Sequence, residues 1–184
     1  MRRDPSKCHF LASHANSGFI APLCTVIEMR VRPAIRSDLP AIEALFEELD
    51  AFHRVRLPER FQDPGGRART KEHLVELVEG ADHTILLAEN DETTLGFVTL
   101  EVRDTPPLPL FVPRRIGVID SLGVRASVRR GGVGRALVAA AETWLREHGA
   151  SDVELSVYEA NQEAVAFYEA VGYRLLSRRM SRHL

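Results

Sequence analysis

Glycines and arginines make up almost all of the stretch 129–135, which reads RRGGVGR. An apolar run at residues 116–124 precedes it, and a segment with apolar residues at helical spacing follows it. The stretch is therefore expected to join a strand to the start of a helix. Glycine lets a ligand approach the backbone closely, and free N–H groups at a helix start favour an anion. This combination predicts a site for a ligand that carries a diphosphate.

Two familiar phosphate motifs do not fit this turn. A P-loop requires a lysine and a hydroxyl residue after its last glycine, but Arg135 and Ala136 follow Gly134. A dinucleotide fingerprint requires a third glycine where Leu137 stands, and it usually lies at the beginning of its domain. The remaining alternative is that the glycines only make a tight turn, which leaves the flanking arginines unexplained.

The turn resembles the coenzyme A signature of the GNAT superfamily of N-acetyltransferases, Arg/Gln-x-x-Gly-x-Gly/Ala. Arg129, Gly132 and Gly134 occupy its three fixed positions. A second set of residues resembles the fifth strand and fourth helix of that family, and it consists of Leu155-Ser156-Val157, Asn161, Ala164, Phe167-Tyr168 and Gly172-Tyr173. The resemblance covers residues 29–184, which it identifies as one N-acetyltransferase domain.

The resemblance implies that acetyl-CoA binds at these motifs, as acyl donor and without a metal ion. The main chain of Leu122 and Val124 would pair with the pantetheine arm, although core packing explains their apolar character equally well. Arg130 and Arg135 would add positive charge, or they are simply solvated. The full set implied to hold the cofactor is Leu122, Val124, Arg129, Arg130, Gly131, Gly132, Val133, Gly134, Arg135, Asn161 and Tyr168. Asn161 is also a suitable helix cap.

Two residues are expected to carry the chemistry. Tyr168 matches the family's general acid, which protonates the departing thiolate, although a tyrosine on an amphipathic helix is also explained as a core residue. Asp120 is the first candidate for the base that takes a proton from the amine, although an aspartate on a half-exposed strand is often only solvated. Glu48, His53 and Glu101 are the alternatives for this base. Neither cysteine lies near these motifs, so direct transfer in a ternary complex is expected.

The elements that must position these residues follow from hydrophobic periodicity. Apolar residues at helical spacing follow caps at Ser37 or Asp38, at Thr70, at the glycine turn and at Asn161, which predicts four helices. Alternating or continuous apolar runs predict strands at 29–32, 84–88, 95–102, 116–124, 153–157, 173–176 and 179–184. This order predicts a mixed α/β fold. The resemblance implies a mostly antiparallel sheet of six to seven strands, flanked by about four helices, with a splay between its fourth and fifth strands.

The bulk composition limits the partners and the location of the protein. The formal net charge of −2 over 184 residues gives no electrostatic reason to expect nucleic acid or a membrane surface. No metal-ligand spacing surrounds the two cysteines, Cys8 and Cys24, and their placement favours a reduced, cytoplasmic setting. Residues 1–28 are interrupted by polar residues, so they are expected to form a disordered extension, or to precede a true start at Met29.

These observations together predict an enzyme that moves an acetyl group from acetyl-CoA to the primary amine of a small molecule or a peptide. Residues 50–66, the proline-rich link 104–115 and the final strands are expected to grip this acceptor, and a homodimer is possible. A non-catalytic acyl-CoA sensor is the first alternative. An oxidoreductase that uses a dinucleotide is a more distant one.

Overall fold

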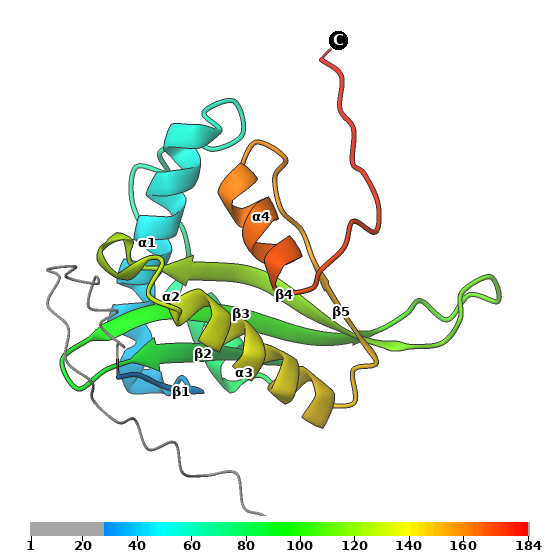
Figure 1. The fold of residues 1–184 in the computed structure, drawn as a ribbon, viewed down its shortest axis with the longest axis horizontal. Coiled ribbons are helices and arrows are strands. Elements are labelled where there is room, and N and C mark those ends of the chain that lie inside the picture. The colour runs from blue at the N-terminus through cyan, green and yellow to red at the C-terminus, as the bar shows by residue number, and fades with distance from the viewer. Residues whose placement is uncertain (1–27, 184) are drawn as a thin grey trace, which may run out of the picture.

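The computed structural model describes residues 28–183, and it shows a five-stranded sheet with helices on both faces (Figure 1). The strands lie in the order of the chain, with the first four antiparallel and the last parallel to its neighbour. They are β1 (Arg30–Pro33), β2 (His83–Glu89), β3 (Thr94–Asp104), β4 (Arg115–Val124) and β5 (Asp152–Leu155). The predicted mixed α/β class is confirmed. The prediction for residues 1–28 lies outside the described residues, apart from Glu28.

Four α-helices connect these strands. They are α1 (Leu39–Arg56), α2 (Lys71–Glu79), α3 (Val133–Glu147) and α4 (Gln162–Ala170), and two short 3₁₀ turns precede α1 and α3. Helix α2 begins at the predicted cap, since the Thr70 hydroxyl accepts a hydrogen bond from the His73 N–H. Helix α1 continues through His53 to Arg56, where the sequence predicted that a link had already begun.

Both faces of the sheet are buried, which explains the nearly continuous apolar runs of β2 and β3. On one face, side chains such as Leu86 and Val98 pack against Leu137 of α3. On the other face, Leu87 and Phe97 pack against α1 and α2. The central strands therefore supply two hydrophobic layers, and α1 and α3 lie on opposite sides of them (Figure 1).

The sheet has five strands rather than six to seven, because residues 173–183 form no strand. This segment leaves the domain after α4 (Figure 1), and its apolar side chains are exposed, by 70% at Leu175, 77% at Leu176 and 91% at Met180. At this edge of the sheet a sixth strand would pair with β5, which is only four residues long. So short a partner gives few hydrogen bonds to hold an added edge strand.

The end of β4 extends beyond β5. The two strands pair only from Ile116↔Asp152 to Ile119↔Leu155, whereas β4 continues to Val124. The resulting gap lies where the resemblance placed the splay between the fourth and fifth strands. The link between β3 and β4 projects from the opposite end of the sheet, away from α1 and α4 (Figure 1). No helix in residues 28–183 is long and apolar enough to cross a bilayer.

Candidate active site

The glycine turn adopts the conformation that its composition suggests. Gly132 is the N-cap of α3 with φ 88°, and Arg130 also has a positive φ of 65°. A Cβ atom on Gly132 would meet nothing within 4 Å, so its backbone conformation, rather than packing, favours glycine there. Turns that combine right- and left-handed residues form concave arrays of N–H groups, and these bind anions at a helix start.

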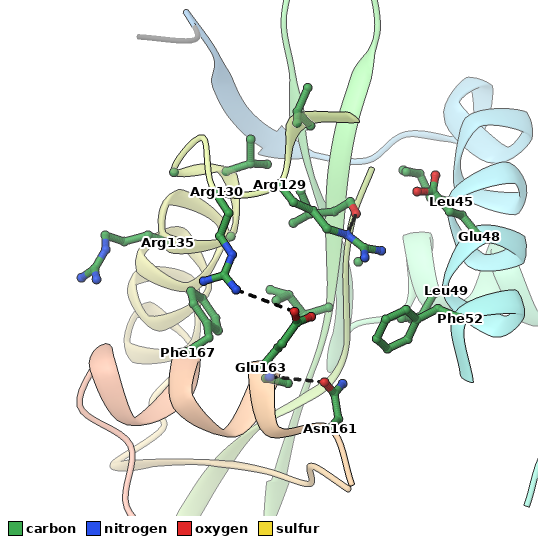
Figure 2. A pocket seen from close by; sticks show the side chains of 18 residues that line it. Leu45, Glu48, Leu49, Phe52, Arg129, Arg130, Arg135, Asn161, Glu163 and Phe167 are labelled. Carbon is green, nitrogen blue, oxygen red and sulfur yellow. Dashed lines mark hydrogen bonds and ion pairs between the residues drawn. The ribbon is translucent and has the colours of Figure 1, made fainter. Parts of the chain in front are cut away.

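A cavity of about 320 Å³ begins at this turn and continues to the end of β4. Helix α1 forms the opposite wall and the first turn of α4 forms the floor (Figure 2). Nine of the eleven residues predicted to hold a cofactor line it: Leu122, Val124, Arg129, Arg130, Gly132, Val133, Gly134, Arg135 and Asn161. The other two, Gly131 and Tyr168, do not line it. The turn, the gap beside β4 and α1 therefore share one cavity.

Arg129 and Arg130, two of the three arginines that line the cavity, have different contacts. The Arg129 Nε donates a hydrogen bond to the Val124 carbonyl oxygen at 3.1 Å, and its guanidinium lies 5.2 Å from the centre of the Phe52 ring. The Arg130 side chain is 85% exposed and lies 3.8 Å from a carboxylate oxygen of Glu163 (Figure 2). Arg129 is thus oriented across the cavity toward α1, whereas Arg130 is oriented toward the start of α4.

Asn161 has the predicted capping role. Its side-chain oxygen accepts a hydrogen bond from the Ala164 N–H at 3.3 Å, at the start of α4. It also lines the cavity (Figure 2). The cap is confirmed, and contact with a cofactor stays a prediction.

Tyr168 lies beside the cavity rather than in its wall. Phe167, one residue earlier on α4, lines the cavity instead. The Tyr168 ring packs edge-on against Phe167 at 5.2 Å and against Tyr173 at 5.8 Å. Burial raises the pKa of Tyr168 to about 12, because the phenolate is poorly solvated there. The phenol is therefore protonated throughout the neutral range.

Of the four candidate bases, only Glu48 lines the cavity. Its Oε1 accepts a hydrogen bond from the Ala126 N–H at 2.7 Å, so α1 is tied to the chain that follows β4. Asp120 is exposed on β4 and accepts a hydrogen bond from the Ser121 hydroxyl at 3.1 Å. His53 lies near the C-terminal end of α1 among aromatic rings, and Glu101 lies on β3.

Sequence reasoning missed most of the wall that α1 contributes. Leu45 and Leu49 were expected only in the core, and Phe52 was not singled out, yet all three line the cavity. Their spacing of four and three residues places them on one helical face. That spacing is the only signal, and it is the same for a core face as for a cavity wall. Glu163 at the start of α4 was missed as well.

The described residues contain no group of three or more His, Cys, Asp or Glu side chains that could hold a metal ion.

The chain is similar to proteins of a known family. The model of the Acetyltransferase (GNAT) family matches residues 42–173. Mycothiol acetyltransferase from Salinispora arenicola is 40% identical over 79 residues, and the protein of that name from Salinispora tropica is 39% identical over 80 residues. These matches cover 42% and 43% of this chain but only 24% of each relative, so the chain matches about a quarter of their length.

Solved structures share the whole fold. A tetramutant of the BH1408 protein from Bacillus halodurans superimposes with a TM-score of 0.79 at 24% identity, covering 84% of this chain and 99% of that one. AAC(6')-Iy in complex with a bisubstrate analogue, CoA-S-monomethyl-acetylneamine, superimposes with a TM-score of 0.67 at 18% identity, covering 85% and 98%. At these identities the likeness establishes the fold.

Proposed function

Because the chain belongs to the GNAT acetyltransferase family, we propose that it transfers an acetyl group from acetyl-CoA to a primary amine. The observation that carries this proposal is the single cavity shared by the glycine turn, the unpaired end of β4 and helix α1. Such a cavity can hold the diphosphate at one end and the thioester beside β4. An amine that approaches from the α1 side then attacks the thioester directly, in a ternary complex.

The donor would be held mainly by the main chain. Residues at the start of α3 line the cavity, and their N–H groups together with the helix dipole would favour the diphosphate there. Arg130 and Arg135 add positive charge. The main chain of Leu122 and Val124, which β5 leaves unpaired, would bind the pantetheine arm in the manner of a neighbouring strand. One of these N–H groups would polarise the thioester carbonyl as its oxygen gains charge.

We propose Tyr168 as the general acid for the leaving thiolate. Its raised pKa of about 12 keeps the hydroxyl protonated and able to donate a hydrogen bond. A thiol has an ordinary pKa of about 8.5, so complete proton transfer from this phenol would be uphill. Tyr168 therefore acts chiefly by stabilising the thiolate through a hydrogen bond while it forms. It must approach the thiolate from beside the cavity, past Phe167.

Two carboxylates are candidates for the general base that takes a proton from the amine. Asp120 is the residue that the sequence favoured, and Glu48 is the one that lines the cavity. Glu48→Gln and Asp120→Asn variants separate them, since the residue that accepts the proton should lose about 100-fold or more in kcat/KM. The pH-rate profile of the same variant should lose its acidic limb. A variant that retains both the rate and the profile removes its residue from the mechanism.

The decisive test is release of free thiol from acetyl-CoA by the purified chain over a panel of amines. The panel should contain the acceptor of mycothiol acetyltransferase and an aminoglycoside, because the matched relatives and structural neighbours are named for these activities. Tyr168→Phe should lower turnover by about tenfold or more with little change in coenzyme A affinity. Tyr173→Phe, an equal change 5.8 Å away, is the matched control and should retain turnover.

A coenzyme A-binding sensor without turnover is the second candidate. The placement of Tyr168 beside the cavity favours it, since a binding module needs no acid at the thioester. Binding of coenzyme A with no thiol release from any amine would support the sensor and contradict the enzyme. Stabilisation by NAD(P) and not by coenzyme A would instead support the oxidoreductase alternative.

A further inference from the structure

Four aromatic side chains from three separate segments meet at the C-terminal end of α1. They are Phe52 and His53 of α1, Phe61 of the following link and Tyr158 of the link between β5 and α4. We call them the aromatic cluster. The His53 and Phe61 rings stack with centroids 5.0 Å apart and an angle of 17°. Tyr158 stands edge-on to Phe61 at 5.6 Å and to His53 at 6.3 Å.

The aromatic cluster is continuous with the cavity. Phe52 lines the cavity on the α1 side (Figure 2), and its ring lies edge-on to His53 at 5.8 Å. The cluster is not sealed, because Tyr158 is 45% exposed and Phe61 and His53 are only partly buried. Ring surfaces therefore lead from the α1 wall, where an acceptor would enter, to the protein surface.

Two arginines near the cluster are already paired with carboxylates. Arg54 lies 2.6 Å from a Glu47 carboxylate oxygen, and Arg56 lies 3.6 Å from one of Glu163. Neither arginine is therefore left as an unpaired cation that would repel an incoming ammonium group.

The imidazole of His53 behaves as a further uncharged ring. Its burial lowers its pKa, an effect that outweighs the attraction of Asp50 for the protonated form. A neutral ring near pH 7 does not repel an incoming ammonium group, and its stacking on Phe61 holds that ring in place within the cluster.

We propose that the aromatic cluster is the acceptor subsite and that it selects primary amines carrying an aromatic ring. This rests on the proposed function, since it names the acceptor of the same cavity. The amine would point along α1 toward the thioester beside β4, while the ring lies against the aromatic cluster. Aromatic pairs contribute beyond the area that they bury, by an amount that corresponds to about two- to tenfold in affinity.

The test compares 2-phenylethylamine with 2-cyclohexylethylamine, which keeps the carbon skeleton but lacks the π-system. The ratio of their kcat/KM values, measured by thiol release, should favour the aromatic amine by about two- to tenfold in the wild-type chain. Phe61→Leu and Tyr158→Leu should each bring this ratio close to one. Phe111→Leu, an exposed ring on the link between β3 and β4 and outside the cavity, should leave the ratio unchanged.

Calorimetric titration of both amines into the coenzyme A-loaded chain gives a second measurement that needs no turnover. Tighter binding of 2-phenylethylamine that is lost in Phe61→Leu supports the subsite. Turnover or binding of both amines without a ring preference overturns the subsite and leaves the acetyltransferase proposal standing. A preference that survives both cluster substitutions also overturns it. Absence of thiol release from every amine, with coenzyme A bound, contradicts the proposed function instead.

Discussion

Substitution of Gly132 tests where the diphosphate binds. With φ 88° this residue is left-handed, and an added Cβ would meet nothing within 4 Å. Gly132→Ala should therefore cost only the strain of a side chain at positive φ, about 1–2 kcal/mol. For a domain of this size each kcal/mol lowers Tm by about 2–4 °C. The variant should fold and should bind coenzyme A nearly normally.

Gly132→Glu adds a negative charge to the same strain. A carboxylate about 6 Å from a diphosphate with about two charges costs roughly 1.4–5.5 kcal/mol, for effective dielectric constants of about 80 to 20. Coenzyme A affinity should fall by at least about tenfold. Thermal denaturation with and without coenzyme A measures both effects, because a ligand that binds the folded state raises Tm according to its affinity.

Gly65 provides the matched control. It too has a positive φ, 66°, with nothing within 4 Å of an added Cβ, and it does not line the cavity. Gly65→Glu should lose similar stability but retain coenzyme A affinity. If folded Gly132→Glu bound coenzyme A as tightly as Gly65→Glu does, the diphosphate would not lie at the start of α3.

Three further predictions concern the scaffold around the cavity. Gly123→Ala should destabilise the domain by about 1–3 kcal/mol in chemical denaturation, because its Cβ would collide with the buried ring of Phe97. Arg32→Ala should cost about 1–3 kcal/mol near pH 7, since it removes charged hydrogen bonds to Asp38 and to buried Glu89. Because Arg32 lowers the pKa of both carboxyls, the difference from wild type should shrink as the pH falls below their ordinary values of about 4 and through the lowered ones. Stability should decline as pH rises from about 10 toward 12, because the unfolded chain releases the Tyr168 proton first, and Tyr168→Phe should weaken this decline.

Each of these outcomes has a direct check. Arg36→Ala removes an exposed ion pair with Glu79, so it should change stability less than Arg32→Ala does. Equal losses in the two arginine variants would contradict the assigned role of the buried pair. An unchanged denaturation midpoint for Gly123→Ala would show that Phe97 moves aside without cost. An equally steep alkaline decline in Tyr168→Phe would assign the lost protons to other groups.

The glycine turn could be predicted from the sequence because its signal is local. Left-handed backbone and an open helix start are properties of a few consecutive residues, and glycine reports them directly. The caps at Thr70 and Asn161 were predictable for the same reason, and the structure confirms both. The order of strands and helices followed from periodicity, which also depends on neighbours in the chain.

The α1 wall could not be predicted in this way. The spacing of Leu45, Leu49 and Phe52 shows that they share a helical face, but whether that face meets a core or a cavity depends on distant elements. The direction of the Tyr168 side chain could not be predicted from the sequence for a similar reason. Successive residues on a helix point about 100° apart, so the rotation of α4 decides whether Phe167 or Tyr168 enters the cavity. That rotation is set by tertiary packing.

The length of β5 explains why the cavity exists at all. Had β5 continued beside β4 past Ile119, its hydrogen bonds would have occupied the edge that Leu122 and Val124 leave open. Instead β5 ends at Leu155, and the chain turns through Tyr158 into α4. The same early ending therefore exposes the edge of β4, where the donor is proposed to bind, and brings Tyr158 to the rings of α1, where the acceptor is proposed to bind. Both proposed substrate sites thus depend on one short strand, and an insertion that lengthened β5 by two residues should impair the binding of both substrates.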